Sequence, residues 1–139
     1  MSTLHSAIVP GLIAGVISIF TSWLWMGVIF HRFQKETPGT WRPEGARSYI
    51  LSSALQFVTA IGLACLFTLV VRFNIGIFAI GFQGALLFAI AIWFVLALPI
   101  LLESAVYINL HPLVVVGQLI NWLTTSMLAC LITAWWLRR

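Results

Sequence analysis

Residues 48–71, SYILSSALQFVTAIGLACLFTLVV, contain no Asp, Glu, Lys or Arg. A helix crosses the hydrocarbon core of a bilayer with about 20 apolar residues, so this run is long enough to span a membrane. Three further runs have the same property, and they cover residues 1–30, 73–102 and 104–137. The sequence therefore predicts an all-α membrane protein with four transmembrane helices.

The composition agrees with this prediction. Of the 139 residues, 62% are hydrophobic and 7% are charged, whereas a soluble domain carries about 25% charged residues. The net charge of +4 does not indicate a nucleic-acid partner, because most basic residues lie at the ends of apolar segments or in the loop after the first one. Basic residues in these places set membrane topology. The chain begins without a basic region, and we expect no cleaved signal peptide.

We expect one transmembrane domain that forms two antiparallel hairpins with short loops. The predicted helices cover about residues 7–30, 48–71, 81–108 and 112–136, and a polar loop at 31–47 joins the first two. Ser6 is a candidate N-cap for the first helix. Pro99 should kink the third helix, because it leaves the carbonyl of Val95 without a helical donor.

Four spans place both termini on one side of the membrane, which we call the terminal face. The opposite side, the loop face, carries the 31–47 loop and the turn at 109–112. The basic residues divide four to three between them: Arg32, Lys35, Arg42 and Arg47 on the loop face, and Arg72, Arg138 and Arg139 on the terminal face. The positive-inside rule favours a cytoplasmic loop face, and we expect a bacterial cytoplasmic membrane.

Two short segments resemble each other within the chain. Residues 64–68 read ACLFT and precede Arg72, while residues 129–133 read ACLIT and precede Arg138. A duplicated hairpin, as in some transporters, would explain the match. Chance would also explain it in a chain so rich in apolar residues.

Glu103 is the one charged residue inside an otherwise apolar stretch. An intramembrane carboxylate is a functional-site hypothesis by default, because burying its charge is costly. Gln118 lies at a similar depth across the 109–112 turn, roughly 10 Å below the loop face. Gln56 lies eight residues into the second helix, and Asn121 extends the face of Gln118. We predict a polar intramembrane site formed by these four residues, with Glu103 facing the bundle interior.

Two alternatives to this polar site remain open. Glu103 could be hydrated near the loop face and pair with Arg47, His31 or His111, or it could hydrogen-bond to Gln118 as a link between helices. In the first helix, Ser22 and Trp25 lie near the same level.

Other residues are candidates for helix packing or for a partner interface. Gly11-x-x-x-Gly15 permits close approach of a second helix, either within the bundle or from another protein. Trp25 and Phe30 end the first helix and are candidates for the same role.

We expect no metal site, no cofactor and no enzymatic activity. Cys65 and Cys130 belong to no CxxC pair, and the three histidines lie at helix ends or in a turn. No Ser-His-Asp set, phosphate-binding loop, dinucleotide fingerprint or HExxH motif occurs.

The stretch Trp25-Met26-Gly27-Val28-Ile29-Phe30 resembles the Trp-Tyr-x-Pro-Leu-Phe-like motif of a bacterial family of small four-helix membrane proteins, a domain of unknown function. Trp25 and Phe30 agree with that motif, while Met26 and Val28 depart at its Tyr and Pro positions. The last hairpin, residues 84–136, is similar in its pattern of a long apolar helix, a polar turn and a Leu-rich helix. The resemblance implies a fold and a membrane location, and it carries no activity.

Two functions are compatible with these patterns. The first is an accessory or structural subunit that packs against a larger membrane complex, because the short loops leave little mass outside the membrane. The alternative is a small homo-oligomeric transporter or channel with a polar site around Glu103. The direction in which Glu103 points should separate the two.

Overall fold

The protein is an all-α membrane protein, seen here in a computed structural model that describes residues 3–42 and 45–139, without the side chains of residues 3 and 4. The described elements are α1 (Thr3–Ser22), η1 (Trp23–Ile29), α2 (His31–Gln34), η2 (Pro38–Thr40), α3 (Ala46–Arg72), η3 (Gly76–Ala79), α4 (Gly81–Ile92), η4 (Trp93–Ala97), α5 (Leu98–Tyr107) and α6 (Pro112–Leu137). These elements join into four continuous helices that are long and apolar enough to cross a membrane: His5–Ile29, Ala46–Arg72, Gly81–Tyr107 and Pro112–Leu137.

The observed helix ends lie close to the expected ones, with one larger difference at the start. The first helix begins at Thr3, so Ser6 lies inside the helix and does not cap it. Pro10 consequently sits within α1, where it removes the backbone donor for the carbonyl of Ser6. The loop expected at 31–47 contains two short helices, α2 and η2, and α3 begins at Ala46.

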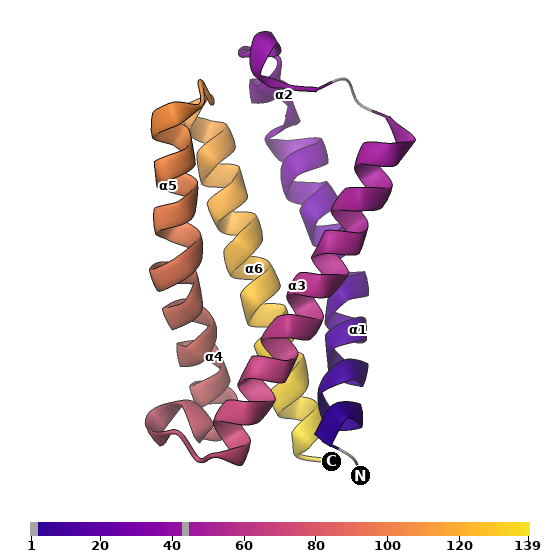
Figure 1. Ribbon diagram of the computed structural model, residues 1–139, viewed down its shortest axis with the longest axis vertical. Helices are drawn as coiled ribbons and strands as arrows, with labels where there is room; N and C mark the ends of the chain where they lie inside the picture. The colour runs from indigo at the N-terminus through magenta and orange to yellow at the C-terminus, as the bar shows by residue number, and fades with distance from the viewer. Residues whose placement is uncertain (1–2, 43–44) are drawn as a thin grey trace.

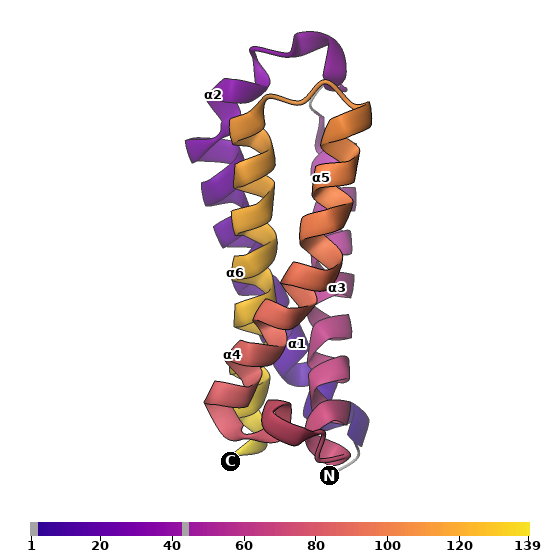
Figure 2. The same cartoon turned by 90° about the vertical axis from the view of Figure 1, so that its left-hand side faces the viewer.

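The four helices form a bundle that is open at one end (Figures 1 and 2). Both termini lie at the bottom of Figure 1, and the segment between α2 and α3 lies at the top, as the two faces were expected to divide. α6 packs against α1, α3 and α4, while α3 packs against α1. α5 stands at the edge of the bundle, packs mainly against α6 and has no buried residue.

The half of the bundle nearer the termini, which we call the terminal half, contains the apolar core. Two clusters of buried residues form it, and small side chains dominate both. Their members are Phe67, Ala85, Ala89, Cys130 and Ala134 in one cluster, and Ala14, Ala60, Leu63 and Ala129 in the other. Small residues let helix backbones approach closely, which increases van der Waals contact where lipid offers no hydrophobic driving force.

Gly11 and Gly15 lie where α1 meets α3. A Cβ atom added to Gly11 would come within 2.7 Å of the Cα atom of Ile61, and one added to Gly15 would meet the ring of Phe57. The two glycines therefore permit a close contact inside this bundle. Phe30, at the end of η1, is buried against Gly117 of α6.

Two of the spanning helices contain a π-helical segment. The N–H of Phe30 donates to the carbonyl of Trp25 at 2.9 Å, five residues earlier, and the N–H of Leu98 likewise donates to the carbonyl of Trp93. The second segment ends at Ala97, two residues before Pro99, so the π-helical turn lies close to the kink that the sequence predicted. Each extra residue in a turn rotates the following helix by about 100°, because a regular α-helix has 3.6 residues per turn.

The polar loop and the turn between α5 and α6 are joined at the loop face. His111 stacks on Phe33 with ring centroids 5.1 Å apart, and its Nε2 lies 3.1 Å from Oε2 of Glu36. The Thr40 hydroxyl donates to the carbonyl of Asn109 at 2.8 Å. His111 Nδ1 also accepts the N–H of Leu113 and so caps α6.

Candidate functional site: a polar pocket in the loop half

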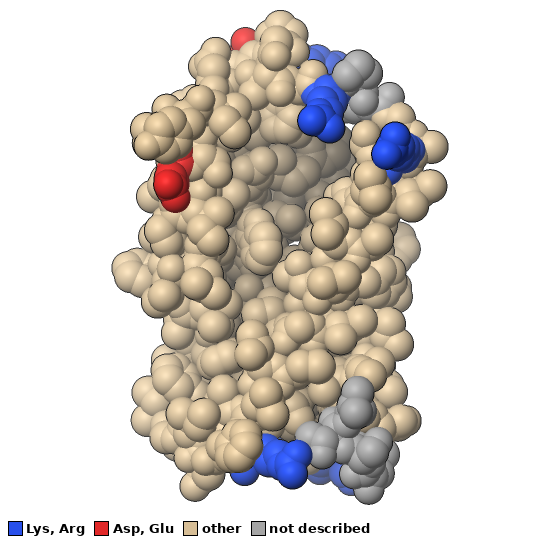
Figure 3. Space-filling view, in the orientation of Figure 1, with Lys and Arg blue, Asp and Glu red and all other residues tan. Residues whose placement is uncertain are grey.

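A pocket of about 250 Å³ lies in the half of the bundle nearer the loop face, which we call the loop half. It is bounded by α1, η1 and α2 on one side and by α3 on the other. Its polar lining consists of Ser22, His31, Gln34, Ser52, Ser53 and Gln56. Trp23, Met26 and Tyr49 add larger side chains to the walls. On the face shown in Figure 3 this half is also hollowed between α3 and α5, although no residue of α5 or α6 belongs to the described lining of the pocket.

The α3 wall of the pocket follows from helical spacing. Tyr49, Ser52, Ser53 and Gln56 stand at positions i, i+3, i+4 and i+7, which share one face of an α-helix. The opposite wall includes part of η1, where the ring of Trp23 lies beside Gly27. Because π-helical turns occur often at functional sites, their presence in a pocket wall favours this pocket as the candidate site.

The serine hydroxyls of the pocket differ from four hydroxyls elsewhere in the bundle. Thr68, Ser104, Thr124 and Thr133 each donate to the carbonyl four residues earlier, at 2.7–2.8 Å. Within the described part of the chain, the hydroxyls of the pocket serines 22, 52 and 53 make no such bond. They are therefore available to a polar group in the pocket.

Polar groups continue from the pocket toward the middle of the bundle. The Gln56 side-chain amide donates to the hydroxyl of Thr125 on α6 at 2.8 Å. The hydroxyls of Ser18 and Ser126 and the side-chain carbonyl of Asn121 are buried and have no partner in the described structure. Buried polar atoms are nearly always hydrogen-bonded in proteins, so this layer is unusual for a membrane-spanning core.

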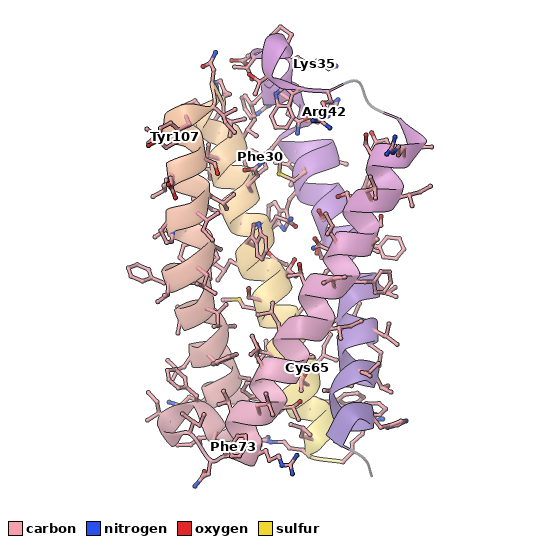
Figure 4. All side chains as sticks on the ribbon, in the orientation of Figure 1. Phe30, Lys35, Arg42, Cys65, Phe73 and Tyr107 are labelled. Atoms are coloured by element: carbon pink, nitrogen blue, oxygen red, sulfur yellow. The ribbon has the colours of Figure 1, made fainter. Side chains whose placement is uncertain are left out.

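The charges of the loop face surround the pocket without entering it. No Asp, Glu, Lys or Arg belongs to the described lining of the pocket. Lys35 and Arg42 lie at the loop end of the bundle, above the hollowed half (Figure 4). Arg32 packs over the ring of Phe33, with its guanidinium carbon 4.6 Å from the ring centroid.

Glu103 lies elsewhere, and the expectation that it is buried toward the bundle interior was wrong. It is exposed on α5, and its carboxylate has no hydrogen bond or ion pair with any residue that the structure describes. Arg47, His31 and His111 therefore do not neutralise it. Glu103 precedes the end of α5 at Tyr107 by four residues, so it lies about 6 Å from the helix end.

The four residues predicted to form one site do not all line this pocket. Only Gln56 lines the pocket. Gln118 and Asn121 are partly buried on α6, and Glu103 faces outward. Sequence reasoning placed Ser22 at the correct level but missed Ser52 and Ser53, although the polar spacing along residues 49–56 could have identified them.

Trp93 joins the two helices of the second hairpin. Its indole N–H donates to the carbonyl of Leu119 on α6 at 2.8 Å. Trp25 is partly buried and lies 6.5 Å from Phe30, measured between ring centroids.

Two of the three basic residues of the terminal face pack on aromatic rings. The guanidinium carbon of Arg138 lies 4.4 Å from the ring centroid of Phe82, and that of Arg139 lies 3.5 Å from the ring centroid of Trp135. Arg and Trp side chains at this level are typical of the membrane–water interface.

The fold and the pocket together define a class: a small integral membrane protein with four spanning helices and a polar pocket in one half. Among the described residues, no three His, Cys, Asp or Glu side chains gather as metal ligands would. Comparisons with protein families, with curated proteins and with solved structures found no match to this chain.

Proposed function

We propose that this protein is an accessory subunit that packs against a larger membrane complex through α5. One observation carries the proposal: α5 has no buried residue and presents Glu103 on its outer face without a partner among the described residues. A carboxylate in contact with hydrocarbon is costly. A basic or hydroxyl-bearing helix of another subunit at the same depth would remove that cost.

The residues around Glu103 support an interface on α5. Leu102, Val106 and Tyr107 surround it on successive turns, and Val106 and Tyr107 are 78% and 82% exposed. An apolar surface alone would suit lipid, so the carboxylate at its centre is what favours a protein partner. The polar atoms of α5 would then be satisfied by the neighbouring subunit.

The experiment combines purification with site-specific cross-linking. The protein is isolated from native membranes in a mild detergent and analysed by native mass spectrometry, with a photoreactive residue at Val106 or, as the matched control, at Val58. Val58 is 67% exposed on α3, so both probes reach lipid in the isolated chain. We expect Val106 to cross-link to a larger subunit at fixed stoichiometry and Val58 to cross-link to lipid.

Glu103→Gln should weaken co-purification of that subunit and leave the melting temperature of the isolated chain unchanged, because the carboxylate has no partner within the chain. If Val106 cross-links only to lipid and the protein purifies alone, the accessory role is wrong.

The alternative proposal is a homo-oligomeric transporter or channel. It is favoured by the polar layer that continues from the pocket to Thr125, Ser126 and Asn121. In such an assembly Glu103 would line a conduction path between neighbouring copies. It faces outward from its own bundle and therefore cannot line a path inside it. Cross-links from Val106 to a second copy, together with ion or solute flux in liposomes, would support this function over the accessory role.

We further propose that the protein resides in a bacterial cytoplasmic membrane with its loop face in the cytoplasm. The four basic residues of the loop face support this orientation. An alkaline phosphatase fusion after Arg139 should then be active, and a green fluorescent protein fusion at the same place should be dark. The opposite pattern would reverse the orientation.

A further inference from the structure

Three serine hydroxyls of the pocket are available to a bound group. Ser22, Ser52 and Ser53 lie at membrane depth and make no hydrogen bond to any described residue. Hydrocarbon cannot satisfy such groups, and each unsatisfied group costs free energy. Apart from His31 and Tyr49, the described lining has no ionisable side chain, and it contains no Asp, Glu, Lys or Arg, which favours an uncharged matching group.

The size of the pocket limits this group. A cavity of about 150 Å³ holds one benzene molecule. The pocket, at about 250 Å³, therefore has room for one six-membered ring with several oxygen substituents. Trp23 and Tyr49 stand on opposite walls and are 64% and 58% exposed, so both can contact the faces or edges of a ring.

The route into the pocket comes from the membrane. Trp23 and Tyr49 belong to the lining and to the outer surface of the bundle, so the pocket is open at its side. Next to the polar stripe, α3 exposes the apolar side chains of Leu51, Leu55 and Val58. These positions lie at i, i+4 and i+7 and form a continuous strip along the helix. An apolar chain attached to the bound group can lie on this strip.

We propose that the pocket binds the head of an uncharged amphiphile: a group the size of one ring, with carbonyl or hydroxyl oxygens, on an apolar tail. The serine hydroxyls and the second N–H of the Gln56 amide donate to the oxygens of the head. The first Gln56 N–H is engaged by Thr125, which holds the amide in place. A quinone and a neutral glycerolipid share this chemistry.

Binding is measured on the full chain in phosphatidylcholine nanodiscs with tritiated decylubiquinone, after subtraction of binding to empty nanodiscs. We expect saturable binding of one molecule per chain. The double variant Ser52→Ala/Ser53→Ala should bind about tenfold more weakly, because it removes two hydrogen bonds. The matched control is Ser104→Ala, whose hydroxyl lies outside the pocket and bonds its own helix, and its affinity should be unchanged.

Two competitors identify the source of the head group. Displacement by excess dioctanoylglycerol as well as by unlabelled decylubiquinone would show that the pocket accepts any neutral oxygen-bearing head. Displacement by decylubiquinone alone would show that it selects a ring. Both results support the proposal.

Three results would overturn it: no saturable binding above empty nanodiscs, equal loss of affinity in the pocket variant and the control, or stronger competition by dodecyl phosphate than by the neutral probes. The melting temperature of each variant is recorded alongside, and the pocket variant should melt within 2–3 °C of the wild type by analogy with other surface substitutions of about 0.5 kcal/mol or less.

Discussion

The two halves of this bundle differ in how closely their helices pack and in how their polar groups are hydrogen-bonded. The terminal half brings its helices together through Ala and Gly, and its buried Thr68 and Thr133 hydroxyls bond their own backbone. In the loop half, α3 and α5 separate, serine hydroxyls lack partners and Glu103 points outward.

Under the proposals above, the terminal half stabilises the fold and the loop half holds the binding groups. A site requires groups that the fold itself leaves unsatisfied, and such groups reduce local stability. The packed half allows the open half to tolerate them. Substitutions should therefore affect stability strongly in the terminal core and weakly at the exposed positions around the pocket.

The largest effect is expected from Gly11→Leu. A side chain here meets the Cα atom of Ile61, and a backbone atom can move away only if α1 and α3 separate. We expect a loss of about 3 kcal/mol in the free energy of unfolding, at the upper end of the range for overpacking. Unfolding by sodium dodecyl sulfate in mixed micelles, followed by circular dichroism, measures it.

Gly62→Leu is the matched control for this variant, because a Cβ atom at Gly62 has no neighbour within 4 Å. It should unfold at nearly the wild-type midpoint. Equal midpoints for the two leucine variants would contradict the close contact between α1 and α3.

A smaller effect is expected from Phe67→Ala, which removes a fully buried ring from the terminal core. The unfolded helices of a membrane protein remain in lipid, so the loss reflects the cavity and the lost contacts more than transfer to water. We expect about 2 kcal/mol. Phe94→Ala removes a ring that is 63% exposed, and its effect should stay within about 0.5 kcal/mol.

The losses in unfolding free energy for Phe67→Ala and Phe94→Ala compare a buried ring in the terminal core with an exposed ring on η4. If Phe94→Ala were as destabilising as Phe67→Ala, the outer surface of η4 would be packed in the membrane by something other than lipid.

A smaller loss than that of Phe67→Ala is expected at the loop face, from His111→Ala. This change removes the cap of α6 together with the stacking on Phe33, and we expect a loss of about 1 kcal/mol. The ion pair with Glu36 contributes little, since the Glu36 side chain is 57% exposed. Hydrogen exchange should accelerate at the first amides of α6.

His111→Asn keeps a side-chain acceptor at the cap position and should preserve most of the protection of these amides. Equal exchange rates in the wild type and in His111→Ala would show that the cap has no role at this helix end.

Much of the fold could be predicted from the charge pattern, because lipid excludes charged side chains from long helical stretches. Each observed span overlaps one charge-free run, although the third span, Gly81–Tyr107, is shifted along its run and includes Glu103. The level of Ser22 and Gln56 in the membrane also follows from counting residues. Their grouping in a single pocket with Ser52 and Ser53 required the contact between α1 and α3.

The error at Glu103 has a physical cause. Counting along a helix gives depth reliably, at 1.5 Å per residue, but gives direction only if every turn has 3.6 residues. The π-helical segment from Trp93 to Ala97 changes that register directly before α5. The side on which Glu103 emerges therefore depended on this segment and on the packing of α5 against α6.

The sequence by itself determined that this chain is a four-helix membrane protein with both termini on one face, because the cost of charge in hydrocarbon leaves few other arrangements. Only the tertiary structure decided which side chains meet. Contacts between helices depend on the rotation of each helix about its axis. In this bundle that rotation depends on the small residues, on the π-helical turns and on the contacts between the polar loop and the turn before α6. For this reason the polar pocket and the outward Glu103 became visible only in the folded bundle.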